Sequence, residues 1–330
     1  MSVSLARAEL ILLASPSLDD TYYQDVADDI TAFHINYARL ILENGDDVII
    51  LTNPSLYDEY ANAIGDDKVV VAPMLDIWMR DFTLTNPKWP LLFRYTAAGQ
   101  GGRQDYSDEV QDEFLSFIKG ANLRFTETPL FNDGGNLVDD NVGNIVISNK
   151  FLKDNKIDED KARVLLQSFA GINNVAFIDA DEQGGLEHAD GVVSFVDENT
   201  LMINSYPDDI AYSQKLKRDL RRGLPHLRIH EIITPYDDSV IYDDRFGSAC
   251  GLYTNALVTP DRIYFPQFNI PEDKIALQQV KAITNREIVP VPSSLVCHMG
   301  GGVRCMSWQL RGDNARRLLQ YIAMLKKQDG

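Results

Sequence analysis

The sequence of 330 residues has few cysteines, no long apolar run and no excess of basic residues. Its three cysteines, Cys250, Cys297 and Cys305, are an odd and sparse set, which argues against a disulfide framework and for a reducing compartment. No cysteine or histidine cluster has zinc spacing. No apolar run approaches the roughly 20 residues that a membrane-spanning helix needs. The apolar stretch at residues 8–15 is interrupted by Glu9 and fits a buried strand better than a signal peptide. We therefore expect a cytoplasmic protein that binds no membrane.

Basic residues are outnumbered, since 31 Lys and Arg stand against 49 Asp and Glu, for a net charge of −18. This balance excludes a nucleic-acid partner, because binding to phosphates requires basic patches. It fits a cationic ligand, although an acidic surface that keeps the protein in solution explains the charge at least as well. The sequence also lacks the glycine-rich phosphate loops GxGxxG and GxxxxGK[ST] after its first strand, so a nucleotide-binding fold is not indicated.

The hydrophobic pattern predicts an α/β protein in which strands and helices alternate. No linker of biased composition interrupts it, so we expect one catalytic domain over residues 1–330. A hairpin that turns at residues 198–199 is expected within residues 191–205. The other main expected strands are residues 10–14, 47–52, 68–72, 91–95, 144–148, 174–179 and 228–233, and the main expected helices are residues 24–43, 108–119, 159–169, 209–222 and 313–327.

Unusual polar residues recur at nearly regular intervals along the chain. Asp81, Asp133, Asp190, Asn255 and Cys305 are separated by 52, 57, 65 and 50 residues. One such residue about every 55 positions predicts five similar β/α units around an axis, each supplying one residue to a central site. Overt self-similarity is weak, so this repeat depends on the spacing of the motifs alone.

Cys305 follows a run of three glycines in the segment MGGGVRCMS at residues 299–307. Glycines let the backbone approach a ligand closely, so the turn can present this cysteine at the floor of a pocket. A structural cysteine needs no such run. We therefore interpret Cys305 as a nucleophile.

Two acidic motifs precede it. In DIWMRD (residues 76–81), Asp81 is an anionic hydrogen-bond acceptor and Trp78 is a flat wall for a planar cation. A charged surface loop is an equally good interpretation of this motif alone. In NDGGN (residues 132–136), the Asp-Gly pair is normally the signal of a tight hairpin turn. The position of Asp133, one interval after Asp81, favours a role in the site.

The third motif, EHADG at residues 187–191, supplies a histidine. Residues two apart on an extended segment point to the same side, so His188 and Asp190 are expected to enter one pocket. A lone histidine is more often a surface or packed residue. Beside an activated cysteine, however, His188 provides the general acid and base that thiol catalysis requires.

One ligand accounts for these groups together. A guanidinium is planar and always charged, and its N–H donors match carboxylates in pairs. Its burial is costly unless carboxylates accompany it. A cysteine protease would have no use for three converging acids, and a metal site would leave the glycine-rich turn at Cys305 unexplained. The residues therefore point to chemistry on a small cationic guanidine substrate.

The segments DIWMRD, NDGGN, EHADGVVSF and GGGVRCMS, in this order, resemble the guanidine-modifying (pentein) superfamily, and most closely its agmatine deiminase and bacterial-type peptidylarginine deiminase family. The segments from Tyr253 to Asn255 and from Pro266 to Phe268 resemble that family as well. The likeness runs from about residue 76 to residue 309. Each motif is weak alone, but four in order are specific.

The resemblance implies a five-bladed β/α propeller with pseudo-fivefold ββαβ units, and a hydrolysis in two steps. Asp81 and Asp190 would hold the guanidinium, and Asp133 would orient His188. Cys305 would attack to form a covalent amidino-thioether. His188 would protonate the departing ammonia and then activate water, which releases a ureido product. No metal or organic cofactor is required. The implied substrate-binding residues are Trp78, Arg80, Asn136, Asn255 and Arg304.

The sequence departs from the family pattern at three positions. Asp133 stands where the family usually has glutamate, which puts its reach to His188 in question. Glu187 stands at a position that is commonly glycine. Arg304 makes the segment at residues 302–307 resemble arginine deiminases more than agmatine deiminases. Its side chain either binds a substrate carboxylate or hydrogen-bonds local carbonyls.

The substrate is therefore the open point. Agmatine ranks first, free arginine second and peptidyl-arginine third. An amidinotransferase and a non-catalytic guanidine-binding pentein remain as alternatives, and a homo-oligomer is compatible with the sequence. Replacement of Cys250 or Cys297 by serine is expected to be nearly silent in activity.

Overall fold

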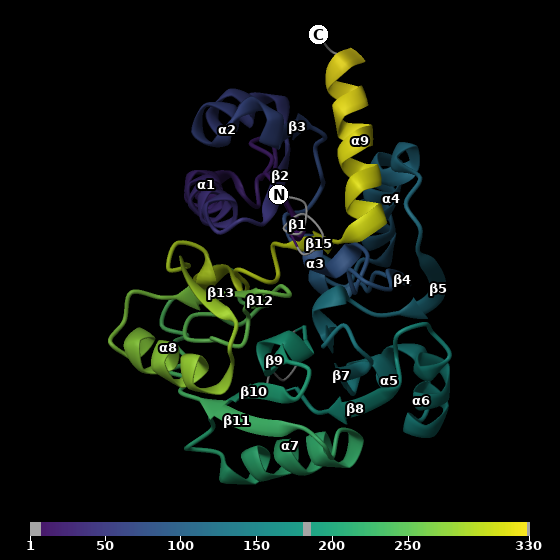
Figure 1. Ribbon diagram of the computed structural model, residues 1–330, viewed down its shortest axis with the longest axis vertical. Coiled ribbons are helices and arrows are strands. Elements are labelled where there is room, and N and C mark those ends of the chain that lie inside the picture. The colour runs from purple at the N-terminus through teal and green to yellow at the C-terminus, as the bar shows by residue number, and fades with distance from the viewer. Residues whose placement is uncertain (1–7, 181–185, 329–330) are drawn as a thin grey trace.

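The computed structural model describes residues 8–180 and 186–328. In this part of the chain the strands form five separate sheets, and helices alternate with them along the sequence. Figure 1 shows that the long helices lie at the periphery and that the strands lie nearer the middle. The expected α/β class is therefore confirmed. Within the described residues, no helix is both long and apolar enough to cross a membrane.

Three of the sheets have the same construction. An antiparallel strand pair is followed by a helical crossover to a third strand, which lies parallel to the second. Crossovers of this kind place a helix against one face of its sheet. In chain order their members are β6 (Leu137–Asp139), β7 (Asn144–Ser148), α5 (Lys150–Asn155), α6 (Glu159–Gln167) and β8 (Asn174–Ile178); β9 (Val193–Asp197), β10 (Thr200–Asn204), α7 (Ile210–Gly223) and β11 (Arg228–Ile232); and β12 (Leu257–Val258), β13 (Arg262–Gln267), α8 (Glu272–Ile283) and β14 (Glu287–Pro292).

The other two sheets depart from this construction. One is a parallel pair joined through α4, and the other has the order β15-β1-β2-β3. In the larger sheet β15 runs antiparallel to β1, with Leu12 opposite Trp308, so the two ends of the chain meet in it. Helix α9 follows β15. The members are β4 (Leu91–Arg94), α4 (Gln104–Ile118) and β5 (Thr126–Phe131), and then β1 (Leu10–Ala14), α1 (Ala27–Glu43), β2 (Asp47–Thr52), α2 (Tyr57–Ile64), β3 (Val69–Val71), α3 (Met79–Phe82), β15 (Trp308–Leu310) and α9 (Gly312–Gln328).

Strand β1 shows how the core forms around these sheets. All five of its residues are buried. Alternate side chains of a strand point to opposite faces. Accordingly, Ile11 and Leu13 pack in the hydrophobic cluster that contains α1, while Leu10 and Leu12 pack in the cluster that contains residues of α4 and α9. The continuous apolar run is explained by this burial on both faces.

The expected elements lie where the pattern predicted them, apart from shifts of a few residues at their ends. Pattern reasoning missed the strands β5, β6 and β15, the helices α2 and α5, and the single turn α3. β5 has one buried residue, Thr128, and its other residues are exposed or half-buried, because it lies at the edge of a two-stranded sheet. α3 has only four residues, which is too short for helical periodicity.

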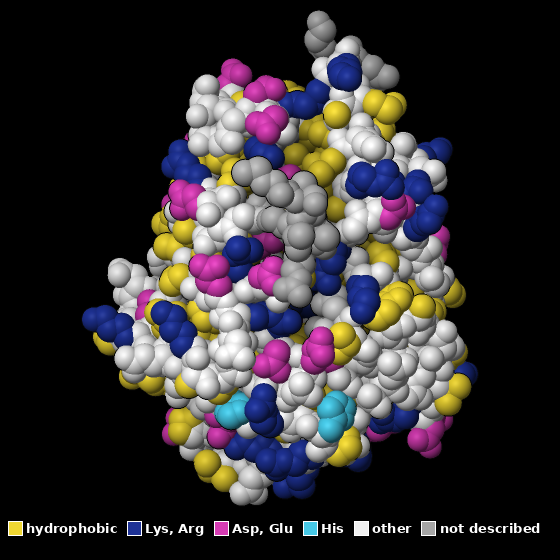
Figure 2. Space-filling view, viewed as in Figure 1, with side chains coloured by type: hydrophobic (Ala, Val, Ile, Leu, Met, Phe, Trp, Pro, Cys, Tyr) yellow, Lys and Arg dark blue, Asp and Glu magenta, His cyan; other side chains and the backbone are white. Residues whose placement is uncertain are grey.

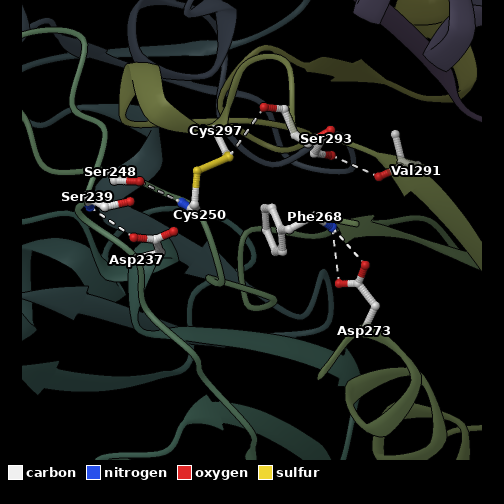
Figure 3. Close-up of a disulfide and its surroundings, with 10 residues drawn as sticks. Asp237, Ser239, Ser248, Cys250, Phe268, Asp273, Val291, Ser293 and Cys297 are labelled. Carbon is white, nitrogen blue, oxygen red and sulfur yellow. Dashed lines mark hydrogen bonds between the residues drawn. A yellow bond between two sulfur atoms is a disulfide. The ribbon is translucent and has the colours of Figure 1, made fainter. Parts of the chain in front are cut away.

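The cysteines are the main correction. Cys250 and Cys297 form a disulfide across a sequence separation of 47 residues, so the expectation of reduced cysteines is wrong for this pair. Figure 3 shows that bond beside Phe268, and Asp273 accepts hydrogen bonds from the Phe268 amide. The pairing depends on the fold, which brings the two residues together; an odd cysteine count could not reveal it. Cys305 is the free cysteine.

Candidate active site

The polar residues that recur along the sequence each follow an edge strand of a different sheet. Asp81 follows β3, Asp133 follows β5, Asp190 follows β8, Asn255 follows β11 and Cys305 follows β14. All five are buried, with exposed fractions of 8% or less. The regular spacing thus reflects one polar residue per sheet at the same point of the chain path.

Two adjoining cavities meet at Cys305. The larger has a volume of about 340 Å³, and His188, Asp190 and Asn255 line it. The smaller has a volume of about 30 Å³ and is lined by residues that include Trp78 and Asp81. Both cavities share four lining residues, Leu186, Phe246, Gly300 and Cys305. A small ligand at the junction would therefore contact the thiol and both carboxylates.

The Cys305 side chain is held by its neighbours. The Asn255 Nδ2 amide donates a hydrogen bond of 3.0 Å to its sulfur, which lies 3.8 Å from Oδ2 of Asp190. A Cβ on Gly301 would lie 2.3 Å from Cζ3 of Trp78, so a residue without a side chain is needed there. Burial, together with the nearby charges of Asp190 and Asp81, raises the pKa of the Cys305 thiol well above its usual value. We infer that the sulfur is a thiol before substrate arrives.

His188 lies between two carboxylates. Its Nε2 is 2.9 Å from Oδ2 of Asp133, and its Nδ1 is 3.7 Å from Oδ1 of Asp81. Burial alone would lower the pKa of His188, but Asp81 and Asp133 outweigh it and raise this pKa to about 9. The imidazole is therefore protonated at neutral pH. Residues 189–191 form a 3-10 turn, so the expected extended segment is wrong, although His188 and Asp190 do line one cavity.

The backbone of Gly135 lies close to Asp81 and fixes its side chain. The Gly135 amide donates a hydrogen bond of 3.0 Å to its Oδ1. A Cβ on Gly135 would lie 2.6 Å from Nδ1 of His188 and 2.8 Å from Oδ1 of Asp81, so only glycine fits between them. Burial, and then the charge of Asp133, raise the pKa of Asp81 to about 7. The protonated His188 lowers the pKa of Asp81 but does not outweigh its burial, so Asp81 becomes fully charged only above neutral pH.

Asp133 has support that the sequence did not suggest. Its carboxylate accepts hydrogen bonds from the Thr96 amide and hydroxyl, at 2.9 and 2.8 Å, and Nζ of Lys150 lies 3.7 Å away. Burial acts to raise the pKa of Asp133, but His188 and Lys150 lower it to about 2. Lys150 also pairs with Asp154, four residues later. That spacing is visible in the sequence, whereas the approach to Asp133 exists only in the fold. Asp133 caps a 3-10 turn rather than a hairpin.

Three predicted substrate-binding residues lie outside the cavities at Cys305. Asn136 bonds to Asn132 and accepts from the Ser148 amide, so it ties its turn to β7. Arg304 pairs with Asp190, at 2.6 Å between Nη1 and Oδ2, and donates to the Leu137 carbonyl. The side chain of Arg80 donates to Gln309. Both arginines line a separate cavity. Trp78 and Asn255 do line the cavities at Cys305.

The charges at the junction suit a cation. Asp81 and Asp190 face it, and among the described lining residues of both cavities no lysine or arginine is present. Buried carboxylates are stabilised by a cation with several N–H donors. A carboxylate-bearing ligand would find no lysine or arginine among these described lining residues.

Comparison with known proteins agrees with this geometry. Residues 1–310 match the sequence pattern of the Porphyromonas-type peptidyl-arginine deiminase family. The chain belongs to this family. The result confirms the family resemblance inferred from the four motifs.

Individual relatives are distant. A protein of Enterococcus faecalis whose name places it among the agmatine deiminases is 27% identical over 157 residues, which is 40% of this chain and 42% of that protein. The match thus spans less than half of the relative's length. The structure of C. jejuni agmatine deiminase superimposes with a TM-score of 0.75 at 17% identity, covering 94% of this chain and 95% of that one. DDAH from Pseudomonas aeruginosa gives a TM-score of 0.54 at 13% identity, covering 92% of this chain and 100% of that one. The family member described here shares their mixed α/β fold.

Proposed function

We propose that this protein is a hydrolase that deiminates a small guanidine, with agmatine as the preferred substrate. One observation carries the proposal: a buried thiol, a protonated histidine and two carboxylates converge on a lining that holds no basic lysine or arginine among the described residues. The family membership and the agmatine deiminases among its relatives support the same activity.

Substrate binding prepares the nucleophile. The guanidinium lies between Asp81 and Asp190 and neutralises the two charges that raise the pKa of the Cys305 thiol. The added positive charge beside the sulfur then favours loss of the thiol proton to water. The thiolate attacks the central guanidinium carbon and forms a C–S bond.

His188 completes both steps. As a protonated imidazole it gives its proton to one nitrogen, and the C–N bond breaks to release ammonia and leave a covalent amidino-thioether on Cys305. The neutral imidazole, held by Asp133, then takes a proton from water. The hydroxide adds to the same carbon, the C–S bond breaks, and the ureido product leaves.

Agmatine ranks above free arginine because no lysine or arginine is present among the described lining residues of the cavities at Cys305. Free arginine carries a carboxylate, which a lysine or arginine would stabilise on burial. Arg304 was the residue expected to provide it, but it pairs with Asp190 and lines the other cavity. Peptidyl-arginine also lacks a free carboxylate, and it remains an alternative that the family name favours.

Three further points are part of the proposal. We infer that the five sheets are blades of a β/α propeller, since three of them share the ββαβ construction. We propose one catalytic domain over residues 1–330, and binding of no nucleic acid. A cytoplasmic location remains a proposal, and the Cys250–Cys297 disulfide weighs against it, because disulfides persist mainly in oxidising compartments.

The test is ammonia release and ureido-product formation with agmatine, free L-arginine and a blocked arginyl peptide side by side. Cys305→Ser and His188→Ala should each reduce turnover by at least about 10³-fold, as loss of a nucleophile or its proton partner usually does. Wild-type-like rates in either variant would refute the mechanism. Turnover that needs an added amine acceptor would indicate an amidinotransferase, and guanidine binding without turnover at any pH would indicate a binding protein.

A further inference from the structure

The second cavity is separate from the one at Cys305 and larger. It has a volume of about 400 Å³, within the size range of small-molecule sites. Residues from all five sheets or from the loops next to them line it, including Arg80, Val138, Ser194, Val258 and Gln309. Figure 2 shows acidic and basic side chains gathered around the middle of the face that it draws.

An ion pair lies between the two cavities. Arg304 lines the second cavity, and Asp190, its partner, lines the cavity at Cys305. The Arg80 amide also donates to the Cys305 carbonyl, at 3.0 Å, while its side chain lines the second cavity. The two cavities therefore lie back to back across the segment that holds the nucleophile.

Arg80 is the unusual group in this cavity. Its side chain is only 3% exposed, yet none of the described carboxylates lies within ion-pair distance of it. Its Nε and Nη2 contact the Arg304 carbonyl and Oε1 of Gln309, both of which are neutral acceptors. Burial and the neighbouring Arg304 lower the pKa of Arg80 to about 10. A buried guanidinium without a carboxylate costs free energy that a bound anion would offset.

Several basic side chains around Arg80 have no carboxylate partner among the described residues. Five lysines and arginines line the cavity. Arg304 and Arg311 have carboxylate partners, whereas Arg80, Lys88 and Arg286 have none among the described residues. The side chain of Arg286 donates only to the carbonyls of Pro260 and Val196.

The acids of the lining already accept hydrogen bonds or lie at the rim. Asp140 accepts from three amides of its own turn and from the Asn144 side chain. Asp139 accepts from Asn86 and from the Asn141 amide. Asp197 accepts from the Asn199 amide, and Glu198 is exposed. Among the described residues, Arg80 therefore has no carboxylate to pair with in this cavity.

We propose that this cavity is a second ligand site, which binds a small oxyanion, a carboxylate or a phosphate, on Arg80 with Arg286 and Lys88 nearer the mouth. Two oxygens of such a group match the N–H donors of a guanidinium. The site is independent of the proposed deimination, because none of these three side chains lines the cavities at Cys305.

The test is calorimetric titration of the full chain with inorganic phosphate and, separately, with citrate, at ionic strength matched with chloride to remove general screening. We expect saturable binding with one site per chain. Arg80→Gln and Arg286→Gln should each weaken it at least about tenfold, the loss expected for one charge-assisted hydrogen bond. Binding of phosphate only, or of citrate only, would support the site and identify the oxyanion source.

Controls separate this site from the active site and from general charge. Arg316→Gln removes an exposed arginine of α9, which pairs with Asp313, and should leave the affinity unchanged. Cys305→Ala should bind the anion as the wild type does, and saturating agmatine should not displace it. If Arg80→Gln does not unfold cooperatively, Arg286→Gln alone decides. No heat with either anion at about 10 mM, wild-type affinity in both cavity variants, or displacement by agmatine would overturn the proposal.

Discussion

Asp133 lies 2.9 Å from His188, measured from Oδ2 to Nε2, even though its side chain is one methylene shorter than the glutamate that the family usually has. The contact is made within a buried network in which Thr96 donates twice to the same carboxylate. The reach that the sequence left in question is therefore sufficient. A longer side chain at this position would have to displace Thr96 or His188.

Replacing Asp133 tests how much of the His188 charge depends on this contact. Asp133→Asn keeps the shape but removes the negative charge, so the pKa of His188 should fall from about 9. Turnover should drop by about 10²-fold or more, since general acid–base catalysis typically contributes that much. Steady-state kinetics with agmatine would measure it. Asp133→Glu is the control, and recovery of full activity in it would show that the cavity accommodates the usual residue.

The pH dependence of kcat/KM should be bell-shaped. Below about pH 7 Asp81 takes up a proton and can no longer pair with the cation, so kcat/KM falls as the pH decreases. Above about pH 9 His188 loses the proton that the departing ammonia needs, so kcat/KM falls again as the pH rises. Rates measured from about pH 5 to about pH 10 would locate both limbs. A profile in Asp81→Asn with the same acid limb as the wild type would contradict this assignment.

Arg304 should influence rate without selecting substrate. Arg304→Gln leaves Asp190 unpaired beside the sulfur, which raises the thiol pKa further and should lower kcat for every guanidine by roughly tenfold or more. The ratio of kcat/KM for agmatine to that for free arginine should stay within about threefold, since Arg304 lies outside the cavities at Cys305. A selective loss of arginine turnover would instead show that Arg304 binds the substrate carboxylate.

The disulfide should stabilise the fold. Breaking it in Cys250→Ser reopens a loop closed across 47 residues, which should lower the free energy of unfolding by about 2–4 kcal/mol. Denaturant titration would measure the loss, and wild-type protein treated with a reductant should match the variant. Titration of thiols in unreduced, unfolded protein should give one thiol per chain, and three would show that the bond does not form. The activity of Cys250→Ser is still expected to be close to wild type, because the Ala249 amide keeps its 2.8 Å bond to the Cys297 carbonyl.

His34 should make stability depend on pH far from the active site. It is fully buried, its Nε2 has no partner, and burial lowers its pKa to about 3. The unfolded chain therefore takes up a proton below about pH 6.5 that the folded chain refuses down to about pH 3. The free energy of unfolding should fall by about 1.4 kcal/mol per pH unit in this window from this residue alone. His34→Phe should remove that slope, and the exposed His226→Asn should keep it.

The sequence singled out residues that the fold places at equivalent points, because each of these polar residues follows a strand of a different sheet. The regular interval between successive polar residues, from Asp81 to Cys305, corresponds to the length of one sheet with its helix, so the spacing reflected the geometry of the fold. The direction of side chains was not predictable in the same way. Arg304 neighbours the nucleophile in sequence but lines the opposite cavity, because adjacent residues in a turn diverge.

Other features depend on contacts that no local pattern encodes. Lys150 reaches Asp133 only because α5 begins where β7 ends, next to the turn of the preceding sheet. Cys250 and Cys297 are likewise brought together by the fold rather than by their spacing. Burial on both faces of β1, by contrast, was readable from its unbroken apolar run.

The pairing of β15 with β1 has a consequence for how the protein is made. Residues 10–12 are synthesised long before their antiparallel partners, residues 308–310. At roughly 5–20 residues per second, this edge of β1 has no partner for about 15–60 seconds. Cys305 is added only three residues before β15 begins, so the nucleophile and the closing strand arrive together. A nascent chain that stalls before Cys305 would expose an apolar strand edge and lack this thiol, so the sheet edge and the site at Cys305 are completed at nearly the same moment.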